Sequence, residues 1–235
     1  MKLLALDTAT DLCSAALWID GQLEGRETLA PRGQGRLLLP MVDALLSEAA
    51  LSLRQLDAIA FGRGPGAFTG LRLAAAVAQG LGFAAGLPLI PVSDLRALAA
   101  QALEDPLTAA ARRVLVCQDA RMGQVYWGCF ERRDGRLQPI DAERVDDPVA
   151  VRLPAGWGEA APVLCAVGSG FAAYPALMER LGAELGALLG ERYPRAREVA
   201  VLAVQDGMGA ALAPEAALPV YLRDRVADVP DSGRN

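Results

Sequence analysis

The chain has 235 residues, of which 53% are hydrophobic, and its 23 basic and 28 acidic side chains give a formal net charge of −5. This length supports one large domain or two small ones with a substantial core. The acidic balance argues against a stand-alone nucleic-acid-binding protein, whose affinity rests on a concentrated basic surface. The sequence contains no histidine, which excludes Ser-His-Asp triads and His-ligated metal centres.

The four cysteines are scattered and form no C-x-x-C pair, as expected of reduced core residues in a cytoplasmic protein. The first residues run into Asp7 and do not resemble a secretion signal. The longest apolar stretch, residues 73–87, is interrupted by Gln79 and by glycines and is too short to span a bilayer. We therefore expect a cytoplasmic protein without membrane contact.

The first elements in chain order form an antiparallel meander. Apolar runs predict strands over residues 2–7, 13–19 and 22–28. Asp20-Gly21 separates the second run from the third, and this dipeptide is a strong hairpin signal. The chain therefore opens with three strands that are adjacent in one sheet.

Helices and strands then alternate, which is typical of parallel strands joined by crossovers. Leu38, Met41, Val42 and Leu45 recur at helical spacing. The pattern predicts, in order, a helix over 36–50, a strand over 57–61, a helix over 69–85, a strand over 89–92 and a helix that Ser93 caps and that runs to 103.

The meander pattern restarts after residue 106. A strand over 114–118 ends at Asp119, and Asp134-Gly135 separates two further strands. The remaining predictions are strands over 124–131, 136–140 and 163–167, and helices over 172–181 and 199–211. The repeat predicts an α/β protein of two similar lobes, 1–106 and 107–235, whose last helix could pack back on the first lobe. Two such lobes resemble the actin, Hsp70 and sugar-kinase superfamily, whose lobes carry a ribonuclease-H-like sheet.

The loop GRGPGAFTG, residues 62–70, lies between a predicted strand and a predicted helix. Glycine lets the backbone approach a ligand or another chain closely, and helix N-termini attract anions. A phosphate loop of the Walker type needs a lysine after its last glycine, but Lys2 is the only lysine in the chain. Ala67 also takes the place of the third glycine of a dinucleotide loop. The loop therefore predicts a strand–turn–helix and gives little support for catalysis.

Several longer strings together resemble the TsaB (YeaZ) family over essentially the whole chain. The strings are LALDTATDLCSAALW near the start, GRGPGAFTGLR from Gly62, PVSDLRALA at 91–99, DARMGQVYW at 119–127, VGSGFAAYP at 167–175 and PVYLR at 219–223. One departure is Gln34, in a segment where members of the family often carry a histidine. Gln34 can supply only neutral hydrogen bonds.

The resemblance implies a cytoplasmic role in forming N6-threonylcarbamoyladenosine beside the anticodon of tRNAs that read codons beginning with A. It implies a non-catalytic subunit, without catalytic residues, metal or cofactor, that activates a TsaD-like transferase paralogue. A TsaE-like ATPase would join them, tRNA would be engaged indirectly, and the isolated chain could form a homodimer. A nucleotide at the shared interface stays open.

A stripe of small residues marks the second long helix as a candidate partner surface. Gly70, Ala74, Ala78 and Gly82 recur every four residues and would permit close approach of another helix. The stripe could equally pack on the protein's own sheet. With the family resemblance, we predict a partner or dimer interface that consists of Leu38, Met41, Val42, Leu45, Gly70, Ala74, Ala78 and Gly82.

Residues near the strand ends are candidates for a residual nucleotide cleft, namely Asp7, Thr8, Gly64, Gly66, Asp119 and Arg121. If Asp7 and Asp119 faced each other across the cleft, the chain could be an ATP- and Mg²⁺-dependent phosphotransferase of small molecules. The alternative, which we favour, is that turn amides satisfy both carboxylates.

Overall fold

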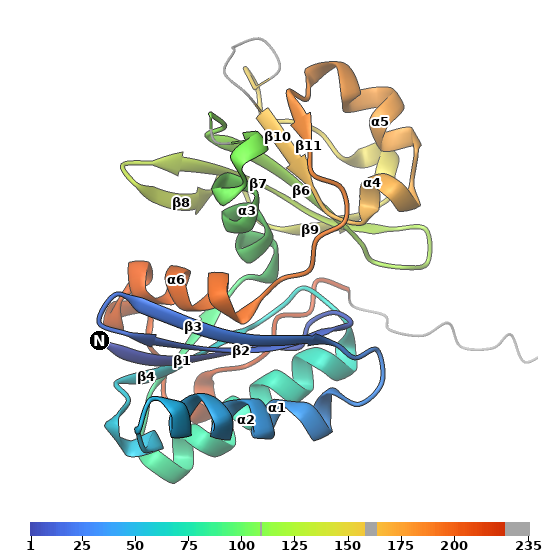
Figure 1. Ribbon diagram of the computed structural model, residues 1–235. Coiled ribbons are helices and arrows are strands. Elements are labelled where there is room, and N and C mark those ends of the chain that lie inside the picture. Colours follow the sequence, from blue (N-terminus) through green and yellow to red (C-terminus); the bar gives the residue numbers. More distant parts are fainter. Residues whose placement is uncertain (109, 158–163, 224–235) are drawn as a thin grey trace, which may run out of the picture.

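The computed structural model describes residues 1–108, 110–157 and 164–223. Two lobes lie one above the other, and each is built on a mixed β-sheet with helices packed against it (Figure 1). The predicted fold class is therefore confirmed.

The first sheet has the strand order β3-β2-β1-β4-β5. β1 (Lys2–Asp7), β2 (Leu12–Ile19) and β3 (Gln22–Leu29) form the predicted antiparallel meander. β4 (Ala58–Gly62) lies parallel to β1, and β5 (Leu89–Val92) lies parallel to β4. Asp20 and Gly21 both have positive φ, 46° and 101°, as a tight hairpin between twisted strands requires.

Three helices cover this sheet. α1 (Gln34–Glu48) and α2 (Phe68–Ala85) lie on one face, where Leu4, Leu6 and Phe61 are buried beneath them (Figure 1). α6 (Ala196–Asp206) comes from the end of the chain and packs on β1 and β2 from the other face (Figure 1).

The second sheet has the order β11-β10-β6-β7-β8, and β9 also pairs with β7. Its central strands are β6 (Arg113–Asp119), β7 (Val125–Arg133) and β10 (Leu164–Val167), and its shorter ones are β8 (Arg136–Pro139), β9 (Arg144–Asp146) and β11 (Ala187–Leu188). Asp134 and Gly135 form the predicted tight turn, with φ of 51° and 76°. β9 and β11 were not predicted, because two or three residues are too few to show a strand pattern.

Two of the predicted helices of the second half are wrong in extent. The helix expected over 172–181 is two helices, α4 (Gly170–Ala173) and α5 (Ala176–Leu181), because Tyr174 precedes Pro175 and has extended-like φ and ψ of −132° and 88°. The last helix was expected to run to residue 211 but ends at Asp206, since Gly207 turns the chain with φ of 70°. Short 3-10 helices cover Leu53–Gln55, Pro106–Thr108, Pro148–Ala150, Gly182–Glu184, Met208–Ala210 and Pro214–Ala216.

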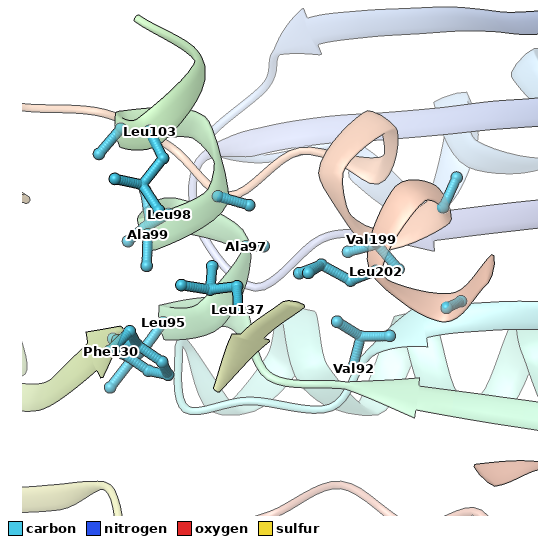
Figure 2. Close-up of a cluster of buried hydrophobic side chains, with 14 of the residues drawn as sticks. Val92, Leu95, Ala97, Leu98, Ala99, Leu103, Phe130, Leu137, Val199 and Leu202 are labelled. Atoms are coloured by element: carbon cyan, nitrogen blue, oxygen red, sulfur yellow. The ribbon is translucent and has the colours of Figure 1, made fainter. Parts of the chain in front are cut away.

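The two lobes share one hydrophobic core, which α3 (Asp94–Glu104) and α6 build between the sheets. Figure 2 shows Leu95 and Leu98 of α3 near Val199 and Leu202 of α6, with side chains of both lobes around them. Each such side chain contributes about 1.5–3 kcal/mol on burial. α3 precedes residue 106 but packs on β6 and β10 of the second sheet, so the lobe boundary at residue 106 stays a prediction.

α2 is long and apolar enough, by length and composition alone, to cross a membrane, and a third of it is buried within the protein. Its buried side packs on β4 and β1. Its remaining surface is considered with the candidate site.

Candidate functional site

A cleft of about 660 Å³ opens between the two lobes. The first lobe lines it with residues 9–11 and with the glycine loop, including Gly66 and Phe68. The second lobe contributes Asp119 and Arg121, and the C-terminal segment 220–223 completes the wall. Three of the six predicted cleft residues, Gly66, Asp119 and Arg121, therefore line the cleft.

The other three predicted cleft residues, Asp7, Thr8 and Gly64, are buried and do not line it. The backbone N–H of Ala9 donates to Asp7 Oδ1 at 3.0 Å. The turn therefore satisfies one oxygen of Asp7, while Oδ2 has no donor among the residues that the structure describes. The arrangement in which Asp7 and Asp119 face each other across the cleft is wrong, because Asp7 is fully buried and does not line the cleft.

Asp119 stays at the wall of the cleft. Its Oδ1 accepts hydrogen bonds from the backbone N–H of Arg121 at 2.8 Å and from the Tyr174 hydroxyl at 2.9 Å. Its Oδ2 forms an ion pair of 3.2 Å with Arg121, whose side chain is 84% exposed. Burial, followed by the hydrogen bond to Asp119, raises the pKa of Tyr174. Asp119 thus also acts as a turn residue, and its second oxygen is paired with Arg121 at the cleft wall.

The glycine loop encloses the protein's own β1–β2 turn. A Cβ atom on Gly66 would lie 2.5 Å from the carbonyl oxygen of Ala9, and one on Gly70 would overlap the carbonyl oxygen of Thr8. The Thr8 hydroxyl donates to the Gly70 carbonyl at 2.7 Å, and the Ala67 amide donates to the Ala9 carbonyl at 2.7 Å. The close approach that these glycines permit is therefore made by residues 8 and 9.

The two remaining loop glycines are also explained by contacts within the chain. A Cβ on Gly64 would lie 2.6 Å from the carbonyl oxygen of Val220, where the C-terminal segment crosses the loop. A Cβ on Gly62 would overlap Asp7 Oδ2 and lie 2.5 Å from Asp94 Oδ1. Gly62 thus leaves room for two carboxyl groups that meet beneath the loop.

Sequence reasoning missed the meeting of Asp7 with Asp94. Both side chains are fully buried, Asp7 at the end of β1 and Asp94 in the first turn of α3. Ser93 caps the same helix by accepting from the Arg96 amide at 3.1 Å. An aspartate after a helix cap looks like an ordinary acidic residue of the first helical turn. In the sequence, the only indication of a second buried carboxyl group was the glycine at position 62.

The predicted interface residues lie mostly inside the lobe. Seven of the eight are buried, namely Leu38, Val42, Leu45, Gly70, Ala74, Ala78 and Gly82, and only Met41 is partly exposed. α2 packs on β4, on β1 and on the 3-10 helix Pro214–Ala216, and Gly70 and Gly82 lie against Thr8 and Leu89 of the same lobe. The structure therefore supports the alternative reading, in which the stripe packs within the protein. Because these seven residues are buried within the lobe, they are not available to a partner and are removed from the predicted interface.

The outward side of α2 is apolar as well, whereas α1 also exposes Arg36, Asp43 and Glu48. Exposed or partly exposed side chains follow one another along α2 at helical spacing, and Leu39 and Met41 extend the surface onto α1. α2 carries a single charged residue, Arg72, in its second turn. We call this surface the outer face and define it by Leu39, Met41, Leu73, Ala76, Val77, Gly80 and Ala84.

An arginine and two aromatic rings stack where the outer face meets the cleft. The Arg72 guanidinium lies 3.8 Å from the centre of the Phe68 ring and donates to the Tyr221 hydroxyl at 3.2 Å. Phe68 is 37% exposed. Tyr221 is 42% exposed and lines the cleft. The stack therefore ties the C-terminal segment to α2.

Gln34 links α1 to the meander. Its amide nitrogen donates to the carbonyl oxygens of Thr10 at 2.5 Å and Leu12 at 3.3 Å. Neutral hydrogen bonds of this kind are what glutamine was expected to supply at this position.

Residues 28–229 match the family TsaD, tRNA N6-adenosine threonylcarbamoyltransferase. A tRNA threonylcarbamoyladenosine biosynthesis protein, TsaB, of Escherichia coli is 40% identical over 97% of this chain and 96% of its own length. The TsaB of Haemophilus influenzae is 46% identical over 58% of this chain and 56% of its own length.

Two solved structures from Pseudomonas aeruginosa are similar throughout. One, titled YeaZ, has a TM-score of 0.85 and 40% identity, and the other, described as similar to the peptidase YeaZ, has a TM-score of 0.86 and 42% identity. Each comparison covers 94% of this chain and 99% of the solved chain. The chain therefore belongs to the TsaB (YeaZ) family of tRNA threonylcarbamoyladenosine biosynthesis proteins.

Proposed function

We propose that the chain is a non-catalytic subunit that binds and activates a TsaD-like transferase in the formation of N6-threonylcarbamoyladenosine on tRNA. The observation that carries this proposal is the glycine loop, whose close approaches are taken by the protein's own β1–β2 turn, its C-terminal segment and the carboxyl groups of Asp7 and Asp94. A phosphate group would need the same space and the same amides. We propose that the chain acts in the cytoplasm.

The segment 93–99 supports the same conclusion. In the transferase paralogue, the matching segment is expected to carry metal ligands. Here Asp94 meets Asp7, and the guanidinium of Arg96 forms two hydrogen bonds with Asp206, at 2.6 and 2.9 Å. The polar side chains of this segment therefore hold α3 against β1 and α6.

The outer face is the surface that we assign to the transferase paralogue. α2 presents Leu73, Val77 and small residues with no charge beyond Arg72. Small exposed residues such as Ala76 and Gly80 would let a helix of the partner approach closely. The same surface would join two copies when the chain is isolated, and the TsaE-like ATPase would bind the resulting heterodimer.

Reconstitution tests the role of the subunit. The transferase paralogue, the ATPase, the enzyme that supplies the threonylcarbamoyl adenylate and substrate tRNA are combined with or without this chain, and modified nucleoside is measured. We expect modification to fall to background when the chain is omitted. Undiminished modification would reject the proposed role.

A single substitution tests the outer face. A Cβ on Gly80 would meet nothing within 4 Å, so Gly80→Arg should fold normally while it places a charge in the partner's path. We expect the Kd for the transferase to rise roughly 100-fold or more, because an unpaired buried charge costs several kcal/mol.

Gly209→Arg is the matched control. Gly209 also has nothing within 4 Å of its Cβ position and lies in the 3-10 helix Met208–Ala210, outside the outer face. It should bind the transferase as the parent chain does. Equal binding by both variants would remove the outer face from the proposal while leaving the reconstitution result intact.

A further inference from the structure

Asp7 and Asp94 form a pair of carboxyl groups that is closed off from solvent. Both side chains are fully buried. The Ala9 amide donates to Asp7 Oδ1, and the Gly64 amide donates to Asp94 Oδ2. Asp7 Oδ2 and Asp94 Oδ1 receive no hydrogen bond from any other group among the residues that the structure describes. Both of these oxygens lie against Gly62, where the missing side chain leaves room for them.

Two ionised carboxylates could not stay in this position. Their facing oxygens would repel each other in a site without water, where charges interact far more strongly than in solution. A buried acceptor without a donor also costs about 1–3 kcal/mol. Both problems disappear when one carboxyl group is protonated, because its hydroxyl then donates to the other.

We propose that Asp7 and Asp94 share a single proton, which joins Asp7 Oδ2 to Asp94 Oδ1 and holds the glycine loop against the first turn of α3. Burial raises the pKa of Asp7, and burial together with the facing charge of Asp7 raises the pKa of Asp94 well above its ordinary value. The pair therefore titrates as one unit with one retained proton.

The neighbouring charges favour retention of this proton. On the side of Asp7, Glu198 of α6 acts against ionisation, and the pKa of the Cys13 thiol on β2 is raised to about 11 by burial and by Asp7. On the side of Asp94, Glu143 also acts against ionisation. Glu143 in turn accepts from the Ser93 hydroxyl and pairs with Arg63 at 3.3 Å, while Arg195 pairs with Glu198.

The shared proton connects several parts of the fold. Gly64 donates its amide to Asp94 and accepts from the Asp94 amide at 3.1 Å. The neighbouring Arg63 carbonyl accepts from the Val220 amide at 2.7 Å, where the C-terminal segment crosses the loop. Loss of the proton would separate the two carboxylates and loosen the glycine loop, the start of α3 and the C-terminal segment together.

The dependence on pH has a definite sign. The folded pair binds one proton that the unfolded chain has released, so stability is fully present below the ordinary aspartate pKa of 3.8 and is lost as pH rises towards the raised pKa of the pair. Within that window, the unfolding equilibrium constant should rise about tenfold per pH unit.

Asp94→Asn is the decisive variant. The introduced carboxamide can accept from the Gly64 amide with its oxygen and donate to Asp7 with its NH₂ group, so it replaces the protonated acid at the same net charge. Urea unfolding is measured from about pH 5 to pH 7, below the range where free thiols titrate. We expect the tenfold dependence per pH unit in the parent chain and its absence in Asp94→Asn. Parallel curves would overturn the proposal.

Two further measurements keep the proposal testable if Asp94→Asn does not fold. Infrared spectroscopy of the parent chain at neutral pH should show the C=O stretch of a protonated carboxyl group, and Asp7→Asn should remove it. The absence of that band from the parent chain would overturn the shared proton. Stabilisation of the parent chain, but not of Asp7→Asn, by Mg²⁺ or Ca²⁺ would show a cation in its place and would also overturn it.

The double variant supplies an internal check. Asp7→Asn combined with Asp94→Asn sets two NH₂ groups against each other, since both amide oxygens must accept from Ala9 and Gly64. We expect it to unfold at a lower urea concentration than either single variant. A double variant as stable as the singles would contradict the hydrogen bond between the two side chains.

Discussion

β1 and β6 occupy equivalent positions in the two sheets, and each ends in an aspartate that begins a turn. Asp7 is fully buried, whereas Asp119 lies at the cleft wall and pairs with an exposed arginine. In each case a backbone amide two residues later donates to the carboxylate. The local turn chemistry is the same, and the surroundings differ.

The difference lies in how far a neighbouring glycine loop reaches. In the first lobe, Gly66 and Gly70 pack on the turn itself, against Ala9 and Thr8. In the second lobe, Gly168 and Gly170 pack on the carbonyl oxygen of Cys117, two residues before Asp119. The first loop therefore covers its aspartate, and the second leaves its aspartate in the cleft. The same strand–turn motif thus places its aspartate in the core in the first lobe and at the cleft wall in the second.

The largest expected effect on stability comes from disrupting the packing of the glycine loop on the β1–β2 turn. Gly70→Val places a side chain where the Thr8 carbonyl lies, and neither backbone can move without breaking the contact of α2 with β1. We expect a loss of more than about 3 kcal/mol in the free energy of unfolding, measured by urea denaturation.

Gly80→Ala is the control for this substitution, because a Cβ there meets nothing within 4 Å. It should stabilise the chain by up to about 1 kcal/mol through helix propensity. Similar stability of Gly70→Val and the parent chain would contradict the packing of the loop on the turn.

The next largest effect on stability is expected at the buried Asp7. Asp7→Ala leaves Asp94 buried without its partner and leaves the Ala9 amide without its acceptor. We expect a loss of about 2–4 kcal/mol by chemical denaturation. A loss as small as that of the Asp119 variant would show that the two strand ends are equivalent after all.

A smaller effect is expected where the C-terminal segment meets the second turn. Arg223 donates to the carbonyl oxygens of Ala120 and Arg121 and to Gln124 Oε1, at 2.7–3.3 Å. Arg223→Ala should cost about 1–2 kcal/mol and should speed amide hydrogen exchange in the turn 120–124, while exchange in β1 stays unchanged. Uniform acceleration in both lobes would contradict a local role.

The smallest effect on stability is expected at Asp119, in the cleft wall. Asp119→Asn keeps an acceptor for Tyr174 and loses only the pair with the exposed Arg121, so we expect a loss below about 1 kcal/mol. The pKa of Tyr174, which burial and Asp119 both raise, should fall towards its ordinary value in an ultraviolet titration. An unchanged pKa would assign the whole shift to burial.

The local pattern of residues was sufficient to predict most of the secondary structure. The alternation of apolar runs predicted β1 and β5 at their observed bounds, and the two Asp-Gly hairpins have the positive φ that their residues favour. The helix expected over 172–181 was divided by Pro175, a signal that was present in the sequence and was not weighed.

The buried faces of α1 and α2 were harder to predict, because α2 is apolar on both sides and α1 carries leucines on both its buried and its exposed side. Periodicity could not tell Leu38, which faces the sheet, from Leu39, which is 46% exposed. The small residues Ala74 and Ala78 were compatible with either a partner or the sheet. The position of the sheet decided which side was buried.

The sequence by itself determined the order of the elements, the hairpins, the helix cap at Ser93 and the resemblance that identifies the family. These properties depend on residues close together in the chain or on strings that can be read directly. The tertiary structure alone decided that α6 covers the first sheet, that the glycine loop encloses residues 8 and 9, and that Asp7 meets Asp94. Such contacts join segments that are tens of residues apart in the chain. Their energies depend on burial and on the exclusion of water, and a local sequence pattern does not show either.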